Sequence, residues 1–297
     1  MSISRQNLSI VIVTFKSEKV IHQCISSIDN NIEIIVIENS NNIEFKQDIE
    51  KKYKNVKCHL SAKNLGMGAG NNLGLSYVKT DYVLILNPDV ILDNATINEI
   101  ILASKKIESF TILSPLSIDN KYPNYKIRAS KNNSIKIHEP FKVESVDGFA
   151  MLINKKKIEK LKDNKNPNLF DENFFMYLEN DDLCKRVIDK NENIYIVPDS
   201  KINHLGGKAA DNKYFEEIEL SRNWHWIWSK FYFTKKHNGY LIALIQGLPN
   251  FCSAILKMIF YSMINNKSKR NVYKNRALGY TNALFGRSSW YRPKIDI

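Results

Sequence analysis

Tyr82-Val83-Leu84-Ile85-Leu86-Asn87-Pro88-Asp89-Val90 is an apolar run that ends in a short polar segment with a proline. Its first five residues are apolar without alternation, which is typical of a strand buried on both faces at the centre of a parallel sheet. Pro88 lacks a backbone donor and has a fixed φ, so the strand must end there. Asp89 therefore follows the carboxyl end of a buried strand, where open α/β sheets bind ligands. A single Asp at such a place is otherwise a turn or cap residue.

The composition and the distribution of charge limit the class of protein. The chain has 297 residues, of which 43% are hydrophobic and 25% charged, as in globular proteins. Residues 1–200 contain 27 Lys and Arg against 26 Asp and Glu, whereas residues 201–297 contain 16 against 5. Of the formal net charge of +12, +11 thus belongs to the last third. This distribution argues against a nucleic-acid-binding body and predicts a basic appendage facing an anionic partner.

The cysteines and the N-terminus favour a cytoplasmic location. The four cysteines are scattered without a C-x-x-C pair, so neither a zinc site nor a disulfide framework is predicted. Residues 8–15 are apolar, but the run is short and has no cleavage site, so we interpret it as a first strand and not as a signal peptide.

Alternation of apolar runs with amphipathic segments predicts a parallel α/β sheet with right-handed crossovers. Strands are expected at 8–15, 33–37, 56–60, 82–86 and 111–116, with helices between them. Thr14, Glu38 and Asp89 then follow strand ends on one edge of the sheet. The polar stretch 118–142 is expected to loop over the surface toward a substrate.

A glycine-rich segment, Asn64-Leu65-Gly66-Met67-Gly68-Ala69-Gly70-Asn71-Asn72-Leu73-Gly74, follows the third strand. A dinucleotide fingerprint belongs after the first strand, so a dehydrogenase is rejected. Two interpretations remain open. The glycines either let the backbone approach a nucleotide or allow close packing of a helix.

An acidic group begins a predicted helix after two aromatic residues. Glu179, Asp181 and Asp182 are expected in its first turn, with Asp182 and Arg186 spaced as a helical ion pair. The group is either a charged helix start or a source of a general base beside a substrate hydroxyl. His204, which precedes Gly206 and Gly207 at a strand end, predicts nothing by itself.

Taken in order, these segments resemble the inverting family-2 glycosyltransferases with a GT-A fold, in particular their bacterial rhamnosyltransferase-like branch. The resemblance covers roughly residues 8–235. Its motifs are Val13-Thr14-Phe15, Ile37-Glu38-Asn39-Ser40, the segment 64–74, Asn87-Pro88-Asp89, Gly148-Phe149-Ala150-Met151-Leu152-Ile153, Phe170-Asp171-Glu172-Asn173-Phe174-Phe175-Met176-Tyr177 with its acidic continuation, and His204-Leu205-Gly206-Gly207.

The resemblance implies a function for each motif. Asn87-Pro88-Asp89 stands at the family's D-x-D element, so Asp89 and His204 would bind a divalent cation, Mg²⁺ or Mn²⁺, that bridges the donor diphosphate. The acidic group would deprotonate the acceptor hydroxyl for an in-line displacement with inversion. The residues implied for binding the donor are Thr14, Glu38, Asn64, Gly70, Asn71 and Asn87.

The chain departs from the family pattern at three positions. Glu38 stands where Asp is usual and is one methylene longer, and Asn87 replaces the first carboxylate of D-x-D. Asn180 occupies the usual position of the base, and an amide cannot accept the proton. The base is therefore expected to be Glu179 or Asp181, with Glu179 preferred.

The C-terminal third combines aromatic and basic residues, as at a membrane interface. Residues 1–220 are expected to form the GT-A domain and residues 221–297 a helical, basic, amphipathic region. Residues 240–264 are long enough to span a bilayer but carry Gln246, Pro249, Asn250 and Lys257, so a pair of interfacial helices hinged near 247–249 is expected. The polybasic residues beyond them are Lys267, Lys269, Arg270, Lys274, Arg276, Arg287, Arg292 and Lys294.

The sequence thus predicts a metal-dependent, inverting hexosyltransferase that moves a sugar from a nucleotide-sugar donor to a lipid-linked or polysaccharide acceptor of the cell envelope. Its expected location is the cytoplasmic face of the inner membrane, with an anionic membrane surface as partner and no nucleic acid. The alternative to membrane binding is that the C-terminal region packs on the GT-A domain, or on a second subunit in a homo-oligomer. Asn180 motivates an alternative function. On this alternative the chain is a catalytically inactive GT-A module that binds a nucleotide sugar or acts as a scaffold.

Overall fold

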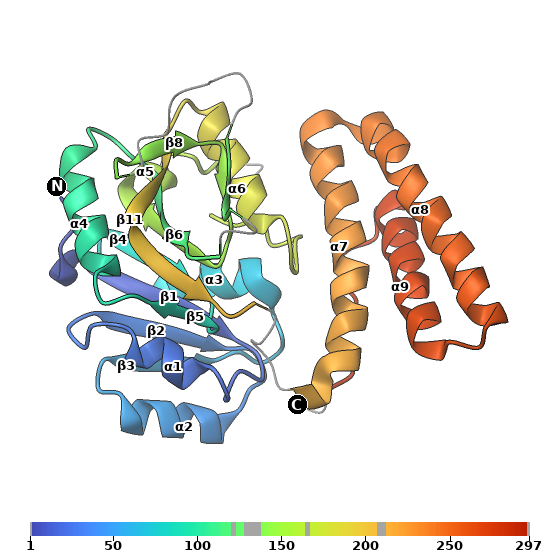
Figure 1. Ribbon diagram of the computed structural model, residues 1–297, viewed down its shortest axis with the longest axis horizontal. Coiled ribbons are helices and arrows are strands. Elements are labelled where there is room, and N and C mark those ends of the chain that lie inside the picture. The colour runs from blue at the N-terminus through green and yellow to red at the C-terminus, as the bar shows by residue number, and fades with distance from the viewer. Residues whose placement is uncertain (1, 120–122, 128–137, 164–166, 207–211, 296–297) are drawn as a thin grey trace. The chain divides into compact units, whose positions relative to one another are not determined.

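The computed structural model describes residues 2–119, 123–127, 138–163, 167–206 and 212–295 (Figure 1). The chain divides into two compact units. The first unit comprises Met1–Leu65, Ala69–Asp171 and Asn180–Asp211. The second comprises Gly66–Gly68, Glu172–Glu179 and Asn212–Ile297.

One half of the central sheet in the first unit is parallel, as predicted. Its strands lie in the order β3-β2-β1-β4. They are β1 (Leu8–Thr14), β2 (Glu33–Glu38), β3 (Val56–Leu60) and β4 (Tyr82–Leu86). Every residue of β1 and β4 is buried, which agrees with their unbroken apolar sequence. The register places Thr14 opposite Glu38 and Ile12 opposite Leu86, so these strands end at one edge of the sheet.

The other half of the sheet mixes the two strand directions. It continues from β4 in the order β10-β6-β11-β5, and β8 pairs with β11. These strands are β5 (Val90–Leu92), β6 (Ile112–Ser117), β8 (Phe141–Val143), β10 (Ala150–Asn154) and β11 (Ile194–His204). β10 is antiparallel to both β4 and β6, whereas β11 is parallel to β6 and antiparallel to β5. The predicted α/β class is confirmed, with the parallel order limited to part of the sheet.

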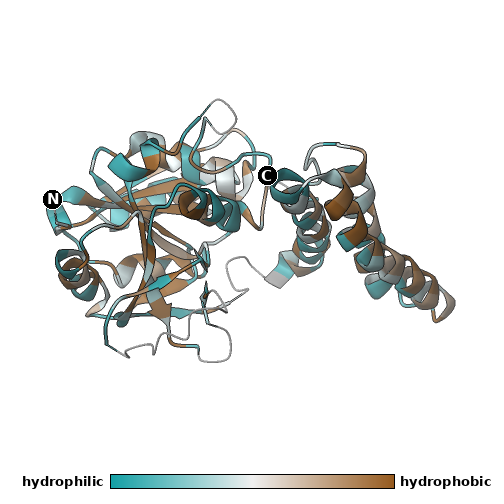
Figure 2. Ribbon diagram, turned by 90° about the horizontal axis from the view of Figure 1, so that it is seen from above, coloured by the Kyte–Doolittle hydropathy of each residue, from teal (hydrophilic) through white to brown (hydrophobic). Residues whose placement is uncertain are grey.

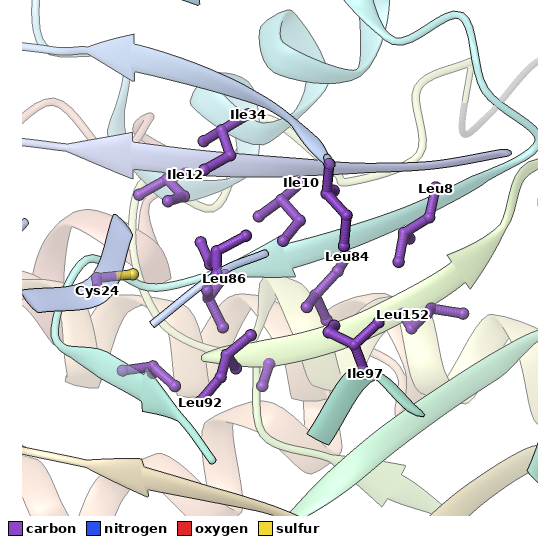
Figure 3. Packing of buried hydrophobic residues seen from close by; sticks show 14 of the residues in the cluster. Leu8, Ile10, Ile12, Cys24, Ile34, Leu84, Leu86, Leu92, Ile97 and Leu152 are labelled. Atoms are coloured by element: carbon purple, nitrogen blue, oxygen red, sulfur yellow. The ribbon is translucent and has the colours of Figure 1, made fainter. Parts of the chain in front are cut away.

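The two faces of β1 pack against different helices. Ile10 and Ile12 belong to a core that includes residues of α1 (Ile21–Ser26), α2 (Ile43–Lys52) and α4 (Thr96–Lys106) (Figure 3). Val11 and Val13 point to the opposite face, because side chains alternate along a strand. There they meet α3 (Gly66–Tyr77), which packs closely enough that a Cβ on Gly74 would lie 2.4 Å from Val11 Cγ1.

Smaller elements complete the first unit. A two-stranded sheet is formed by β7 (Tyr125–Lys126) and β9 (Ser145–Val146). The remaining helices are the 3₁₀ helix η1 (Arg5–Asn7), α5 (Lys155–Glu159) and α6 (Glu179–Asp189), whose first residue is assigned to the second unit. Of the predicted surface loop 118–142, residues 120–122 and 128–137 lie outside the described residues, and the rest contains β7 and part of β8.

The second unit is built on three long helices with an aromatic core. After the 3₁₀ helix η2 (Asn212–Tyr214) come α7 (Phe215–Asn238), α8 (Tyr240–Met263) and α9 (Lys267–Leu284). Trp224, Trp228 and Phe231 of α7 and Tyr280 of α9 are buried together. Gly279 permits the close approach of α9 to α7, because a Cβ there would lie 2.3 Å from the backbone oxygen of Trp224.

The expected pair of helices hinged near residues 247–249 is wrong, because α8 is one helix of 24 residues with Pro249 inside it. A proline removes one backbone donor and crowds the preceding turn. The remaining turns keep their hydrogen bonds, and α8 packs along both α7 and α9, so the helix continues through this position. Among the described helices, α8 is long and apolar enough to cross a membrane by length and composition.

Candidate functional site

Asn87 and Asp89 lie in a tight turn at the carboxyl end of β4. The backbone N–H of Asn87 donates a 2.9 Å hydrogen bond to Phe149 O, which fixes the end of β4 against the segment leading into β10. Val90 N closes the turn on Asn87 O at 3.2 Å, and β5 starts at once. Asp89 is therefore held between two strands, with only 3% of its surface exposed.

His204 is brought to Asp89 by the pairing of β5 with β11. The two strands are antiparallel, and their register places His204 opposite Val90. Leu205 N donates to the backbone oxygen of Asp89 at 3.0 Å. The imidazole Nε2 of His204 lies 3.4 Å from Asp89 Oδ1, and its ring stacks on Phe149 with centroids 4.2 Å apart. The last strand of the unit thus delivers a second potential metal ligand to the end of β4.

The oxygen atoms at this turn fit a bound cation. Asp89 Oδ1 and Asn87 Oδ1 are both buried without a hydrogen-bond donor. A buried acceptor without a donor is unfavourable, and a cation would satisfy it. Among the described residues, no three His, Cys, Asp or Glu side chains converge on one point. Mg²⁺ and Mn²⁺ sites of few protein ligands take their remaining oxygen ligands from water and phosphate.

Thr14 and Glu38 lie opposite each other at the ends of β1 and β2, but both are engaged within the protein. Thr14 Oγ1 donates to Ile37 O at 3.3 Å. The Glu38 carboxylate accepts hydrogen bonds from Ser40 N at 2.9 Å, Ser40 Oγ at 2.5 Å and Asn42 N at 2.7 Å. Glu38 therefore orders the turn that leads into α2, and its predicted contact with the donor remains a prediction.

The glycine-rich segment forms the first turns of α3. A Cβ on Gly70 would lie 2.9 Å from Val13 Cγ1, so this glycine allows the helix to pack against β1. Asn71, the next residue, is 3% exposed, and its Oδ1 has no hydrogen-bond donor. Asn64 lies just before α3 and is half-buried. Close packing thus accounts for Gly70, while Asn71 presents an unsatisfied polar atom.

Glu179 is the first residue of α6 and follows an unusual backbone turn. Tyr177 and Leu178 have φ angles of 71° and 66°, the left-handed region that costs a non-glycine residue about 1–3 kcal/mol. Two such residues in succession are uncommon and often mark functional sites. Glu179 itself is 8% exposed.

The other members of the acidic group have separate partners. Asp181 forms an ion pair with Lys126, Oδ1 to Nζ at 2.8 Å, and Asp182 is fully buried against Arg186 at 2.9 Å, as its spacing predicted. Asn180 Nδ2 donates to Val146 O at 2.9 Å. An aspartate could not donate this hydrogen bond, so the chain uses the position to tie α6 to the segment before Gly148.

Asp147 is a carboxylate near this group that sequence reasoning missed. Desolvation, and secondly the charge of Asp181, raise the pKa of Asp147, while Lys126 and His204 oppose this rise. Desolvation lowers the pKa of Lys126, but its hydrogen bond to Asp181 and the charges of Asp181 and Asp147 raise it by more. The pKa of Lys126 is therefore raised overall. The available signal was the position of Asp147 shortly before β10, because Asp89 likewise stands directly before β5.

The comparison with known families and curated proteins points to one activity. The family Glycosyl transferase family 2 matches residues 9–176. The low-salt glycan biosynthesis hexosyltransferase of Haloferax volcanii is 26% identical over 226 residues, which cover 71% of this chain and 70% of that protein. A rhamnosyltransferase of Escherichia coli is 25% identical over 252 residues, which cover 73% of this chain and 88% of that protein.

Solved structures share the fold. GalNAc-T7, crystallised with UDP, GalNAc and Mn²⁺, superposes with a TM-score of 0.54 at 15% identity, over 67% of this chain and 43% of that one. Residues 1–349 of TarS from S. aureus give a TM-score of 0.50 at 14% identity, over 96% of this chain and 93% of that one. The predicted GT-A fold is confirmed by these likenesses, which carry no information about the substrate.

Proposed function

Because this chain belongs to glycosyl transferase family 2, we propose that it moves a hexose from a nucleoside-diphosphate donor to a hydroxyl of a lipid-linked or polysaccharide acceptor, with inversion. The acceptor would belong to cell-envelope glycan synthesis, and rhamnose is one candidate sugar, since relatives include a hexosyltransferase of glycan biosynthesis and a rhamnosyltransferase. The observation that carries the proposal is the contact of buried Asp89 with half-buried His204, beside Asn87 at the end of a central strand.

Asp89 and His204 are proposed to hold a Mg²⁺ or Mn²⁺ ion. Such an ion would neutralise charge on the leaving diphosphate. The unsatisfied Asp89 Oδ1 and Asn87 Oδ1 support this assignment, because an ordinary turn would pair these oxygens. Thr14, Glu38, Asn64, Gly70 and Asn71 are proposed to line the donor, with Asn71 best supported by its unsatisfied buried oxygen.

Glu179 is proposed as the general base, with Asp181 as the alternative. The acceptor oxygen attacks the anomeric carbon while its proton passes to the carboxylate. The bond from that carbon to the diphosphate oxygen breaks, and its electron pair leaves with the nucleoside diphosphate. The ion pair of Asp181 with Lys126 supports Glu179, because the Asp181 carboxylate is already engaged by an ammonium. The two left-handed residues before Glu179 give further support.

Asn180 motivates a second candidate function, an inactive module that binds a nucleotide sugar or serves as a scaffold. Its amide holds a backbone carbonyl at 2.9 Å and leaves no carboxylate at that position. Turnover separates the two functions. An active enzyme releases nucleoside diphosphate from a sugar nucleotide in the presence of Mn²⁺ and acceptor, whereas an inactive module binds the donor without releasing product.

The proposed place of action is the cytoplasmic face of the inner membrane, with an anionic bilayer as the partner of the second unit. The cationic excess of the last 97 residues supports this partner. A homo-oligomer formed through the same helices is the competing arrangement. Co-sedimentation with vesicles and the mass of the protein in solution distinguish the two.

A further inference from the structure

Helix α8 presents three different stripes along its length. One stripe packs within the second unit and includes Ala243 and Ala254, which are 1% and 3% exposed. Gly247 lies on the same stripe, and a Cβ there would come within 2.3 Å of the Tyr280 ring on α9. The inner stripe is therefore fixed by close contact with neighbouring helices.

The outward stripe is apolar without interruption. With about 100° between successive residues of an α-helix, ten residues fall within an arc of about 120°. They are Leu241, Ile242, Ile245, Leu248, Pro249, Cys252, Leu256, Ile259, Phe260 and Met263, and all ten are exposed. Leu256 and Met263 are 68% and 80% exposed. We call these ten residues the apolar face (Figure 2 shows the hydropathy of the ribbon).

The size and continuity of this face need a covering partner. No polar side chain of α8 falls within the arc, and the helix is about 36 Å long. Soluble proteins rarely leave a contiguous apolar surface of this kind in water. The face therefore fits either the acyl region of a bilayer or a second apolar surface.

A row of polar residues flanks the apolar face. Gln246, Asn250, Ser253 and Lys257 form this row, and all four are exposed. Gln246 and Asn250 also line a small pocket with Lys230 and Thr234 of α7. Lys257 lies beside α9, with its Nζ 5.2 Å from the Tyr273 ring centroid. Cationic and amide side chains thus lie along one side of the apolar face, as they do at the headgroup level of a membrane.

The charges beside the middle of α8 argue against a membrane-spanning helix. The hydrocarbon core is about 30 Å thick, so a spanning α8 would place most of its neighbours at hydrocarbon depth. Lys230 lines the pocket beside Gln246 and Asn250, and Arg276 of α9 donates to Asn223 of α7 at 2.6 Å. Charged side chains are strongly disfavoured in that environment. Because α7 and α9 pack along α8, they would enter the bilayer with it.

We propose that α8 lies lengthwise in one leaflet of an anionic bilayer, with its apolar face toward the acyl chains and the Lys257 row at the phosphates. The inference takes the bilayer from the proposed function and adds the surface and its orientation, but it does not depend on turnover. Charge complementarity favours lipid over a second copy. Two copies meeting through this face would bring together Lys257 and the cations at the start of α9, namely Lys267, Lys269 and Arg270.

Native Cys252 makes the orientation measurable. It lies in the middle of the apolar face and is exposed, whereas Cys24, Cys58 and Cys184 are buried. Burial raises the pKa of the Cys58 and Cys184 thiols to about 12, so these thiols react poorly with a labelling reagent. A polarity-sensitive fluorophore on Cys252 of the full-length protein, without any sugar nucleotide, reports insertion into phosphatidylcholine vesicles with and without phosphatidylglycerol.

Depth-dependent quenching then separates an in-plane helix from a spanning one. Labels at Cys252, or at Ile245→Cys or Ile259→Cys in a Cys252→Ser background, should report the same shallow depth in anionic vesicles. A label at Ser253→Cys should remain nearer the water. A deep Cys252 between shallower ends would contradict the in-plane orientation. Protection of Cys252 without vesicles, together with a dimer mass, would show that a second copy covers the face.

A matched pair of substitutions tests the face itself. Leu256→Glu should weaken partition into anionic vesicles about tenfold or more, because it places a carboxylate among the acyl chains. Ser253→Glu adds the same charge three residues away on the polar row and should stay within about twofold of the native protein. Equal losses in both variants, or no vesicle binding by the native protein, would overturn the proposal. Neither outcome bears on sugar transfer, which is measured separately with a soluble acceptor.

Discussion

His204 Nε2 lies 3.4 Å from Asp89 Oδ1, although one residue follows β4 and the other ends β11. The contact exists because β5, which begins immediately after Asp89, pairs antiparallel with the end of β11. Each of these residues is weak evidence for a metal site when considered alone. Their meeting at a turn with two unsatisfied buried oxygens is the structural basis of the account.

Glu179→Gln should lower the transfer rate by about 10²–10⁴-fold while donor affinity is kept, because an amide cannot take the proton of the acceptor. Steady-state kinetics with saturating donor measure the rate, and titration of the donor measures the affinity. Asp181→Asn is the comparison and should lose less, since its carboxylate is engaged with Lys126. A larger loss for Asp181→Asn would make Asp181 the base, and an unchanged rate in both would place the base elsewhere.

Asn180→Asp should lower the free energy of unfolding by about 1–3 kcal/mol, because it removes the donor to Val146 O and leaves buried acceptors facing each other. Urea denaturation measures the change. Asn94→Asp is a matched control, since it makes the same chemical change at an exposed residue and should have little effect. If both variants keep native stability, the 2.9 Å hydrogen bond between Asn180 and Val146 does not contribute to the free energy of unfolding.

Gly74→Ala should lower the free energy of unfolding by about 1–3 kcal/mol, since the added methyl group would meet Val11 at 2.4 Å. Gly70→Ala should cost less, because its nearest atom on Val13 is 2.9 Å away. Denaturant midpoints give this order. If Gly70→Ala loses donor affinity out of proportion to its loss of stability, Gly70 contacts the nucleotide as well as the sheet.

Acid should destabilise the second unit through His225. Burial lowers the pKa of His225 to about 3, despite the carbonyl of Tyr291 at 2.8 Å from Nε2, and the charge of Arg292 lowers it further. Because the unfolded histidine titrates near pH 6.5, its contribution to stability is complete above that pH and is lost as the pH falls toward 3. The loss is about 1.4 kcal/mol per pH unit within this window.

Tryptophan fluorescence during denaturation at pH 7.5 and pH 5 measures this contribution, since Trp224 and Trp228 share the aromatic core next to His225. His225→Gln is the control, because a side chain that does not titrate should remove most of the difference between the two pH values. An unchanged difference in this variant would assign the acid sensitivity to other groups.

The parallel half of the sheet could be predicted because local patterns determine it. Apolar runs without alternation identified β1, β2 and β4, and Pro88 identified the end of β4. The i,i+4 spacing of Asp182 and Arg186 likewise predicted their ion pair. Each of these features depends on residues that are close together in the sequence.

Features that depend on long-range pairing could not be predicted. The antiparallel insertion of β10 between β4 and β6 leaves no local signal, and neither does the stacking of Phe149 on His204. The continuity of α8 through Pro249 depends on packing against α7 and α9, which outweighs the local tendency to break. Asn180 was recognised as a departure, but its bond to Val146 required the structure.

The most direct test of the account is donor-induced thermal stabilisation across a panel of UDP-, dTDP- and GDP-sugars, with and without Mn²⁺. One nucleotide sugar is expected to raise the melting temperature of the native protein, and this rise should need the metal. Asp89→Asn should abolish the metal-dependent part, and His204→Ala should reduce it, since Asp89 is the buried carboxylate of the proposed pair. Full metal-dependent stabilisation of Asp89→Asn would contradict the assignment of this site.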